Sequence, residues 1–558
     1  MYRLATVFGL ASVRPPHRVY RVRRIVMNEI RNRKLPVGIQ SFREIREGGY
    51  AYIDKTDLIW RFVNQGDKYN YLSRPRRFGK SILVDTLQCY LEGRKELFEG
   101  LKIMQLEKEW STHPVIRFDM SGAGASREEL ISYFEDTFDE YEKKYGITDP
   151  SKTLSKRLKN IIMAAFKQSS QKVAILIDEY DSRLQHSWKT PHHNDCTEVY
   201  RMVFATLKEA DEFEKYVFIT GITKFTQISL FSVLNNLTNQ SFNPQWATIC
   251  GITEEEIKEY FMPEIERMAS YNGWSQHETH DRLKNYYDGY HFCKENMIDI
   301  YNPFSLIKAL STGKIQNFWA SSGATTLLPK FVDDMELRLK DFENCPVMSL
   351  TLETSDVTGG GSELFLYQSG YLTIKSADEF GYILGFPNQE VKQALYELVI
   401  PALTMCKSQE TYSIQAALVR QLGLCQLADA MKSLKALIAD VPYSNKKLAS
   451  MDMEERYRLI ISSILNAIGF RTEVEHILST GRIDILCDTP RYIYVIELKL
   501  RTNGGKAAAV QQIMDRKYLE PFKADKREVI RLGIELDEEG KGLLDWETTV
   551  EGLHAEIE

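Results

Sequence analysis

Residues 70–81 read NYLSRPRRFGKS, and this stretch decides the fold of the first half of the chain. It ends in Gly79-Lys80-Ser81, as a phosphate-binding loop of the form G-x-x-x-x-G-K-[ST] does, but Arg74 stands in the place of the first glycine. A short strand is predicted to end before the loop, and residues 81–93 have helical spacing. At such a junction, backbone N–H groups and the Lys80 ammonium can hold phosphates, and the Ser81 hydroxyl can hold Mg²⁺.

Acidic residues follow a second predicted strand. Residues 172–181, KVAILIDEYD, form an apolar run that ends in acids, which is typical of a parallel strand buried on both faces. At its end, Asp178 is expected to orient the Mg²⁺ shell and Glu179 to polarise an attacking water. A buried strand followed by solvated acids is the structural alternative, and the upstream Lys80 favours the nucleotide site.

A third strand, predicted over residues 216–225, ends in the polar residues Thr220, Thr223 and Lys224. Beside the strand of Asp178, it would bring Thr220 or Lys224 close to a γ-phosphate, where the side chain could sense the nucleotide. The alternative is a threonine that caps the following turn. We keep Thr220 as a candidate nucleotide-binding residue.

Composition limits the possible classes of protein. A chain of 558 residues is expected to form two to four domains, and its mild net charge of -6 neither supports nor excludes DNA as a partner. The eight cysteines contain no C-x-x-C pair, so we interpret His192, His193 and Cys196 as part of a loop rather than a metal site. No apolar run approaches the ~20 residues of a membrane-spanning helix, and we expect no membrane partner.

The middle of the chain has a mostly helical pattern. Residues 253–318, with a cap at Thr253 and a tight turn at Asp288-Gly289, predict a helical lid behind the nucleotide site. Residues 363–403 predict the order helix, strand, turn, strand, helix, which suggests a winged-helix-like module, and the glycines at 359–361 predict a hinge before it. The module could bind DNA or relay the nucleotide state, and its few basic residues favour the relay.

A second chemical pattern lies near the end of the chain. Two strands are predicted there, GRIDILCD (481–488) and YIYVIELKL (492–500). Because side chains alternate along a strand, Glu497 and Lys499 share one face, and Asp484 on the partner strand can meet Glu497. Two carboxylates at that point can chelate Mg²⁺, which activates water and offsets the charge of a phosphate, while the lysine orients the water or the phosphate.

Several stretches together resemble the predicted AAA-ATPase-like family, found mainly in bacteria and usually coupled to a C-terminal nuclease-like domain. In the order of the family, they are LPVGIQSFREIREGGYAYIDKTDLI (35–59), YLSRPRRFGKSIL (71–83), LIDEYD (176–181), FITGITKFTQISLFSVLNNL (218–237), YYDGYHF (286–292) and YNPFSLIKAL (301–310). The resemblance implies that Arg74 belongs to the family's own form of the loop and that ATP is the ligand. The chain departs from the family at Arg183, where a proline is usual, which puts the loop after Asp181 in doubt.

The C-terminal pattern resembles the PD-(D/E)XK nuclease superfamily, in the version that accompanies this ATPase family. It extends from the helix EERYRLIISSILNAIGF (454–470) through both strands to AAAVQQIMDRKY (507–518). The resemblance implies that Asp484 and Glu497 are metal ligands and that Lys499 is the catalytic lysine.

Further residues of this pattern support the same site. The resemblance implies that Glu455, on the helix, and Glu475, near the strand before Asp484, complete the metal shell. It also implies that Gln512 and Tyr518 contact the phosphate backbone or shape the pocket. A nuclease fold that binds without cutting is the alternative.

The expected architecture is α/β, with an AAA-like P-loop NTPase domain, a helical lid, a winged-helix-like connector and a C-terminal restriction-endonuclease-like α/β domain. The expected boundaries are 1–34 for a disordered N-terminal extension, 35–250 for the ATPase domain, 251–330 for the lid, 331–425 for the connector and 426–558 for the nuclease domain.

The predicted function is ATP binding and hydrolysis coupled to a Mg²⁺-dependent nuclease that acts on nucleic acid, with DNA favoured. A cytoplasmic defence or mobile-element switch is the expected context, and a ring, a dimer and a monomer all remain open. The alternative is a signalling or binding ATPase whose nuclease-like domain does not cleave.

Overall fold

The computed structural model describes residues 34–122, 126–149, 153–188, 190–223, 234, 236–319, 342, 344–354, 361–404, 408–439, 452–489, 491–523, 525, 527–539 and 542–550. The N-terminal extension expected over 1–34 lies outside them except for Lys34, as do Lys224 and the first two glycines of the expected hinge. Among the helices that are described, none combines the length and apolarity needed to cross a membrane.

A parallel sheet of five strands forms the first part of the molecule, in the order β2-β3-β4-β1-β5. The strands are β1 (Tyr69–Ser73), β2 (Val115–Asp119), β3 (Val173–Asp178), β4 (Glu214–Gly221) and β5 (Thr238–Asn239). Every residue of β3 is buried, in agreement with its apolar run. β4 lies between β1, which precedes the loop, and β3, which precedes the acids. The loop and the acids therefore lie on either side of the end of β4.

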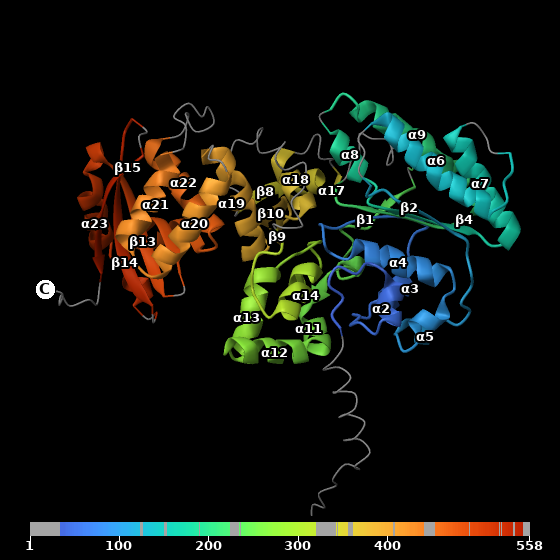
Figure 1. Ribbon diagram of the computed structural model, residues 1–558, viewed down its shortest axis with the longest axis horizontal. Coiled ribbons are helices and arrows are strands. Elements are labelled where there is room, and N and C mark those ends of the chain that lie inside the picture. The colour runs from blue at the N-terminus through green and yellow to red at the C-terminus, as the bar shows by residue number, and fades with distance from the viewer. Residues whose placement is uncertain are drawn as a thin grey trace, which may run out of the picture.

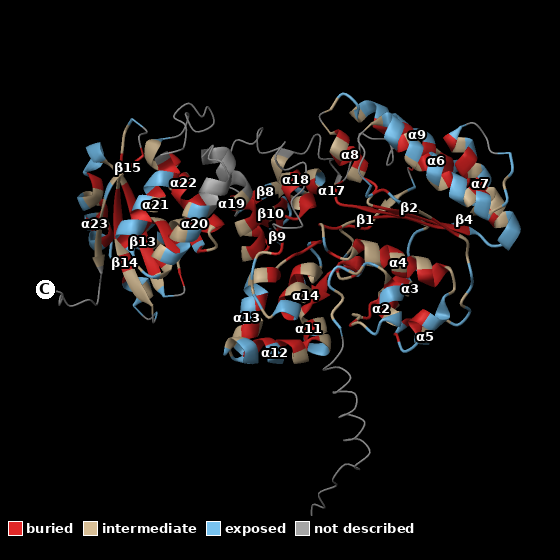
Figure 2. Cartoon of the chain, viewed as in Figure 1, coloured by how far each residue is buried: buried red, intermediate tan, exposed pale blue. Residues whose placement is uncertain are grey.

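Helices cover both faces of this sheet (Figure 1). Those on one face are α2 (Phe42–Glu47), α3 (Thr56–Asn64), α4 (Lys80–Leu91) and α5 (Ile103–Leu106), and those on the other are α6 (Arg127–Lys144), α7 (Leu154–Ser169), α8 (Ser182–Ser187) and α9 (His193–Glu209). In Figure 2 the strands are buried while the long helices expose one side to solvent, as amphipathic helices over a sheet do. His193 and Cys196 belong to α9, so the interpretation of this segment as a loop is wrong.

The predicted lid region is helical. Its helices are α11 (Glu254–Tyr260), α12 (Met262–Asn272), α13 (Gln276–Tyr287) and α14 (Pro303–Thr312), and the short strands β6 (Ile252–Thr253) and β7 (Ile300–Tyr301) pair beside them. Thr253 caps α11 as predicted: its hydroxyl accepts the Glu256 N–H, and the Glu256 carboxylate accepts the Thr253 N–H. The helices share a separate hydrophobic core that includes Phe261 and Leu306.

The connector has the predicted order of helix, strand, turn, strand and helix. These elements are α18 (Gly361–Ser369), β9 (Thr373–Ala377), β10 (Gly381–Gly385) and α19 (Gln389–Thr404). A further strand, β8 (Cys345–Met348), pairs antiparallel with β10 and is followed by α17 (Ser349–Thr354). The winged-helix assignment of this module and its role as a relay stay predictions.

A mixed sheet forms the C-terminal part, in the order β11-β12-β13-β14-β15. Its strands are β11 (Arg471–Leu478), β12 (Gly481–Asp488), β13 (Tyr492–Leu500), β14 (Glu528–Leu536) and β15 (Leu543–Val550), and β13 and β14 run parallel. The accompanying helices are α20 (Ser408–Gly423), α21 (Leu427–Ala439), α22 (Met453–Ala467) and α23 (Gly505–Asp515). As alternation along β13 requires, Ile493 and Val495 share a core with Ile513 of α23, while Tyr494 shares another with Ile461 of α22.

Candidate functional site

The phosphate-binding motif lies where β1 leads into α4, as predicted. Gly79 precedes the helix with φ at 87°, a left-handed conformation that favours glycine. Lys80 is the first helical residue, and its Nζ donates to the carbonyl oxygens of Arg74 and Pro75, each at 3.0 Å. Burial lowers the pKa of the Lys80 ammonium, and the carboxylates of the acidic segment act in the opposite direction. A buried cation held by neutral carbonyls fits an anionic ligand.

Arg74, the residue in place of the first glycine, supports the loop from within. Its guanidinium donates to the carbonyl oxygens of Ser73 at 2.8 Å, and of Ser241 and Trp246 at 3.0 Å each. It also lies 4.1 Å from the ring centroid of Phe292, in cation–π geometry. Only 1% of Arg74 is exposed, so this arginine holds the loop to the segment after β5 and to the turn after α13.

The two predicted acids lie beside the loop. Burial raises the pKa of Asp178, while a hydrogen bond with Ser81 and the charge of Lys80 oppose the shift. The next residue, Glu179, has φ at 47° and donates its N–H to Asp178 Oδ1 at 3.0 Å. Burial also raises the pKa of Glu179, against the charge of Lys80. The left-handed backbone at Glu179 is strained for a non-glycine residue, which is a feature of functional sites.

A cavity of about 520 Å³ opens between the sheet and the lid, a size suited to a small-molecule ligand. Polar side chains from the loop and the acidic segment line it, and apolar side chains from the N-terminal segment and the lid line it as well. The polar set includes Arg76, Arg77, Lys80, Ser81, Ser121, Glu179, Ser182 and His186, and the apolar set includes Ile39, Ile249, Phe261, Phe304 and Ile307.

Two cavity residues were missed by the sequence analysis although a signal was present. Ser182 begins α8 directly after the acids, and His186 lies four residues later in the last turn, so they occupy one face of that helix. The Ser182 carbonyl oxygen lies 2.8 Å from His186 Nδ1.

Thr220, in β4, and Thr223, just after it, are both buried. Thr220 is fully buried, and its hydroxyl donates to the Leu72 carbonyl at 2.7 Å, which joins β4 to β1 beside the loop. Thr223 donates both its N–H and its hydroxyl to Asp181 Oδ2, each at 2.6 Å. Contact of Thr220 with a nucleotide stays a prediction.

The C-terminal acids meet across β12 and β13, as predicted. The backbone ladder of the two strands ends at Ile485 and Ile496, and side chains replace it at the next position. There the Asp484 N–H donates to Glu497 Oε1 at 3.2 Å, and the Leu498 N–H donates to Asp484 Oδ2 at 3.0 Å. The sheet therefore opens where the two carboxylates lie.

Glu497 is the most deeply buried acid of this site. It is fully buried, and burial together with the charge of Asp484 raises its pKa well above the ordinary range, while Lys499 opposes the shift. From α23, Gln512 donates to Glu497 Oε2 at 2.7 Å. Two adjacent carboxylates fit a divalent cation, because metal charge would relieve their repulsion.

The remaining predicted ligands have other contacts. Glu475 Oε1 lies 3.2 Å from the guanidinium groups of both Arg458 and Arg482, and Glu455 lies in the first turn of α22. Tyr518, in the segment after α23, accepts the Arg482 N–H and donates to the Arg482 carbonyl, so it fixes β12. Within the described part of the chain, no group of three or more His, Cys, Asp or Glu side chains is arranged to hold a metal ion.

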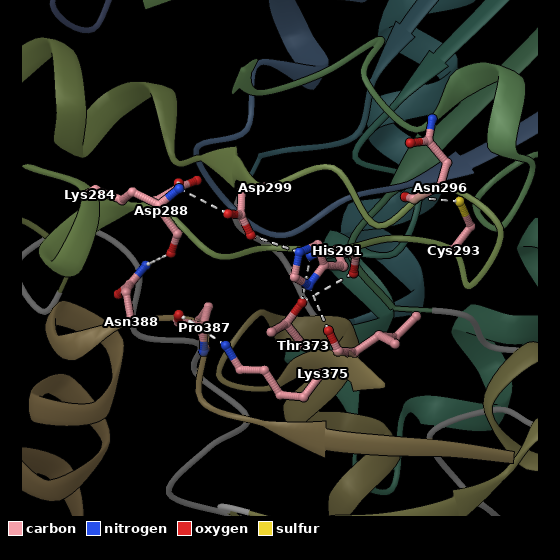
Figure 3. A network of polar contacts seen from close by, with 11 residues as sticks. Lys284, Asp288, His291, Cys293, Asn296, Asp299, Thr373, Lys375, Pro387 and Asn388 are labelled. Carbon is pink, nitrogen blue, oxygen red and sulfur yellow. Dashed lines mark hydrogen bonds and ion pairs between the residues drawn. The ribbon is translucent and has the colours of Figure 1, made fainter. Parts of the chain in front are cut away.

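A buried polar network joins the lid to the connector, as Figure 3 shows. The His291 N–H donates to Thr373 Oγ1 at 2.8 Å, and the Thr373 hydroxyl donates to the His291 carbonyl at 3.1 Å. The His291 ring lies between the Ile374 carbonyl, 2.8 Å from Nδ1, and Asp299 Oδ1, 2.9 Å from Nε2. This histidine therefore attaches the turn after α13 to β9.

The same turn makes a second attachment, to the start of α19. The Asn388 amide donates to the Asp288 carbonyl at 2.8 Å, and a side chain on Gly289 would clash with the Pro387 carbonyl. The Asp288 carboxylate is buried, and burial raises its pKa to about 7. Lys284 lies 3.7 Å from this carboxylate.

These contacts connect the two chemical sites through packed elements. On the nucleotide side, Phe78 of the loop packs against Tyr290, with ring centroids 4.7 Å apart. On the other side, Lys392 of α19 donates to the Thr472 carbonyl of β11 at 3.1 Å, and Gln393 donates to the Ala467 carbonyl of α22 at 3.3 Å. Helix α19 and the turn that follows α13 thus lie between the phosphate-binding loop and α22, the helix that precedes the acidic site.

Comparison with known proteins gives the class of both ends. Residues 36–231 match the family model described as a predicted AAA-ATPase, and residues 452–546 match the model of the PD-(D/E)XK nuclease superfamily. The chain thus carries an AAA-ATPase-like domain and a nuclease-superfamily domain, and both resemblances inferred from the sequence are confirmed.

One relative matches most of the chain. It is an uncharacterized protein in the vnfD 5' region of Azotobacter chroococcum mcd 1, 28% identical over 530 residues, which cover 92% of this chain and 98% of the relative.

Proposed function

We propose that this protein is an ATP-hydrolysing switch that controls a Mg²⁺-dependent nuclease acting on nucleic acid, with DNA as the favoured substrate. The observation that carries the proposal is the pair of Asp484 and the buried Glu497, with Lys499 on the same face, in a chain that also has a loop-lined cavity around Lys80. The two family matches support the same reading.

Each residue of the nucleotide site has its own role in this proposal. Gly79, Lys80 and Ser81 bind the phosphates, since the helix start and the ammonium both attract anions. Asp178, through its hydrogen bond with Ser81, orients the Mg²⁺ shell. Glu179 orients the attacking water and accepts its proton.

The nuclease site uses the carboxylate pair. Asp484 and Glu497 are the residues that would hold Mg²⁺, with Glu455 as a further candidate ligand. A Mg²⁺ ion bound there supplies a water of lowered pKa and offsets charge on the phosphate. Lys499 orients that water or the phosphate, and Gln512 fixes Glu497 through its hydrogen bond.

The nucleotide state reaches the nuclease through the lid and the connector. ATP sets the position of the lid, hydrolysis resets it, and the contacts of His291 and Asn388 carry the change to β9 and α19. The connector acts as a relay in this account. A continuous set of packed contacts between the two sites supports this coupling.

The biological context follows from the resemblance. We propose a cytoplasmic role in defence or in the biology of mobile elements, and a homo-oligomer is one of the assemblies that fit an AAA-like domain.

The nuclease proposal is tested by incubating the full-length protein and its Asp484→Ala variant with plasmid and single-stranded DNA, in Mg²⁺ or Mn²⁺, with and without ATP. We expect the parent to cut and Asp484→Ala to lose cutting, with ATP binding intact in both. Asp488→Ala, which removes a carboxylate four residues along β12, is the matched control and should keep the activity.

The alternative, a signalling ATPase with a non-cleaving nuclease-like domain, predicts another result. No metal would then support cutting by the parent, ATP turnover would persist, and Asp484→Ala would change no activity.

A further inference from the structure

A single arginine contacts the acidic site from the helix before it. Arg458 of α22 places Nη1 3.0 Å from Asp484 Oδ1 and 3.2 Å from Glu475 Oε1. All three side chains are mostly buried, with 14% of Arg458, 17% of Asp484 and 24% of Glu475 exposed, so the ion pairs are weakly screened by solvent.

The strands present both acids to this arginine. Glu475 lies opposite Asp484 in the β11–β12 register, between the paired positions Val474–Ile485 and His476–Ile483. Its φ of 55° is left-handed, which is unusual for a glutamate in a strand. Glu475 is also 3.2 Å from Arg482, so it is paired with two guanidinium groups.

Both oxygens of Asp484 already have a donor. Arg458 donates to Oδ1 at 3.0 Å and the Leu498 N–H donates to Oδ2 at 3.0 Å. A divalent cation that binds Asp484 would therefore lie next to a fixed positive charge. A guanidinium keeps its proton throughout the pH range of proteins, so this charge cannot be removed by deprotonation.

We propose that Arg458 is an internal counterion of the nuclease site, which holds Asp484 while no metal is bound and must release it for a divalent cation to bind. The inference rests on the proposed nuclease function and adds the regulation of that site. Like charges repel strongly where water is excluded, so the same carboxylate cannot accommodate the guanidinium and the metal equally well.

Helix α22 connects this competition between Arg458 and the metal to the rest of the molecule. Arg458 belongs to α22, and the C-terminal end of the same helix accepts a hydrogen bond from Gln393 of α19. A displacement of α22 relative to β12 would move Arg458 away from Asp484. The relay from the nucleotide site therefore ends on the helix that carries the competing charge.

The experiment measures Mn²⁺ binding to the full-length protein without nucleotide, by titration with MnCl₂ and detection of free Mn²⁺ by electron paramagnetic resonance. The ions bound at the nuclease site are those that Asp484→Asn abolishes. The variant is Arg458→Met, and the matched control is Arg527→Met. Arg527 lies 3.3 Å from the carboxylate of Asp488, which is in β12 like Asp484. Thermal unfolding checks that each variant is folded.

We expect Arg458→Met to bind Mn²⁺ about 10- to 100-fold more tightly than the parent at the Asp484-dependent site, the range typical of groups adjacent to metal ligands. Arg527→Met should bind like the parent. Arg458→Lys, which keeps the charge, should also stay close to the parent and covers the case in which the methionine variant unfolds.

Unchanged or weaker Mn²⁺ binding by Arg458→Met overturns the inference, because Arg458 would then be neutral toward the metal or would organise the acids for it. In that case the proposed nuclease function stands if the parent still shows Asp484-dependent binding. Absence of Asp484-dependent Mn²⁺ binding in the parent and every variant overturns both the inference and the proposed nuclease site.

Discussion

Arg74 shows how a single residue can change the form of a phosphate-binding loop while the loop keeps its place between β1 and α4. The side chain that replaces the first glycine turns into the protein, where it makes three hydrogen bonds to carbonyl oxygens of two segments. Lys80 in turn donates to the Arg74 carbonyl, so the arginine positions the backbone that holds the lysine.

Restoring a glycine at this position should therefore damage the protein. We expect Arg74→Gly to lower the unfolding free energy of the ATPase domain by about 3 kcal/mol or more, because charged hydrogen bonds are lost and carbonyl groups stay buried without donors. Scanning calorimetry of the full chain measures the effect. Arg77→Gly is the control, since Arg77 is exposed and its φ of 67° suits glycine; equal melting temperatures of the two variants would contradict this role of Arg74.

For Asp484 and Glu497, the sequence allowed the prediction of the pair but not of its surroundings. Strand alternation placed Glu497 and Lys499 on one face and brought Asp484 opposite, and the structure has this arrangement. The contact of Arg458 with Asp484 depends on how α22 lies on the sheet, a tertiary feature with no local signal. The left-handed backbone of Glu475 is equally invisible, because no glycine or asparagine marks it.

Among the described elements, the turn after α13 joins three parts of the molecule. Phe78 of the loop contacts it through Tyr290, Thr373 of β9 contacts it through His291, and Asn388 contacts the carbonyl of Asp288. The turn itself was predicted from Asp288-Gly289, whereas its partners were not, since β9 and α19 lie far along the chain.

The buried Asp288 should make this junction sensitive to pH. Its pKa is raised by burial from 3.8 to about 7, so its contribution to stability is complete below its ordinary pKa and is lost as pH rises through about 7. We expect Asp288→Asn to unfold at a higher temperature than the parent above neutral pH and at a similar temperature below the ordinary Asp pKa of 3.8, measured by calorimetry.

Asp299 of the same network is a control, because its pKa is shifted in the opposite direction to that of Asp288. Burial acts to raise its pKa, but the hydrogen bond and charge of Lys284 outweigh it and lower the pKa, so this carboxylate contributes stability above its ordinary pKa and loses it in acid. Asp299→Asn should therefore destabilise the protein at neutral and higher pH. The same direction of change in both variants above neutral pH would contradict the account of this network.

The elements differ in how far the sequence reveals them. The buried strand β3 and the capped helix α11 carry strong local patterns and were predicted. The strand β8 has four residues and contains Pro346, so local propensity argues against it, and its pairing with β10 stabilises it. The strand β14 does alternate, with Ile530 and Leu532 buried, and a period-two search of that region would have found it.

At the scale of the whole molecule, the two five-stranded sheets lie at opposite ends, with the lid and the connector between them (Figure 1). No side chain of the loop can act directly on Asp484 in this arrangement. In the proposed function, control of the nuclease by ATP passes through the intervening elements, of which the turn after α13, helix α19 and helix α22 form a continuous series.

The measurement that tests this account most directly is the rate of DNA cutting by the full-length protein with ATP, without ATP and in the Lys80→Ala variant, at one Mg²⁺ concentration. The account predicts that ATP changes the rate of the parent and that Lys80→Ala, which has lost the phosphate-binding ammonium, does not respond. Cutting that depends on Asp484 but has the same rate with and without ATP in the parent would contradict the coupling of the two sites.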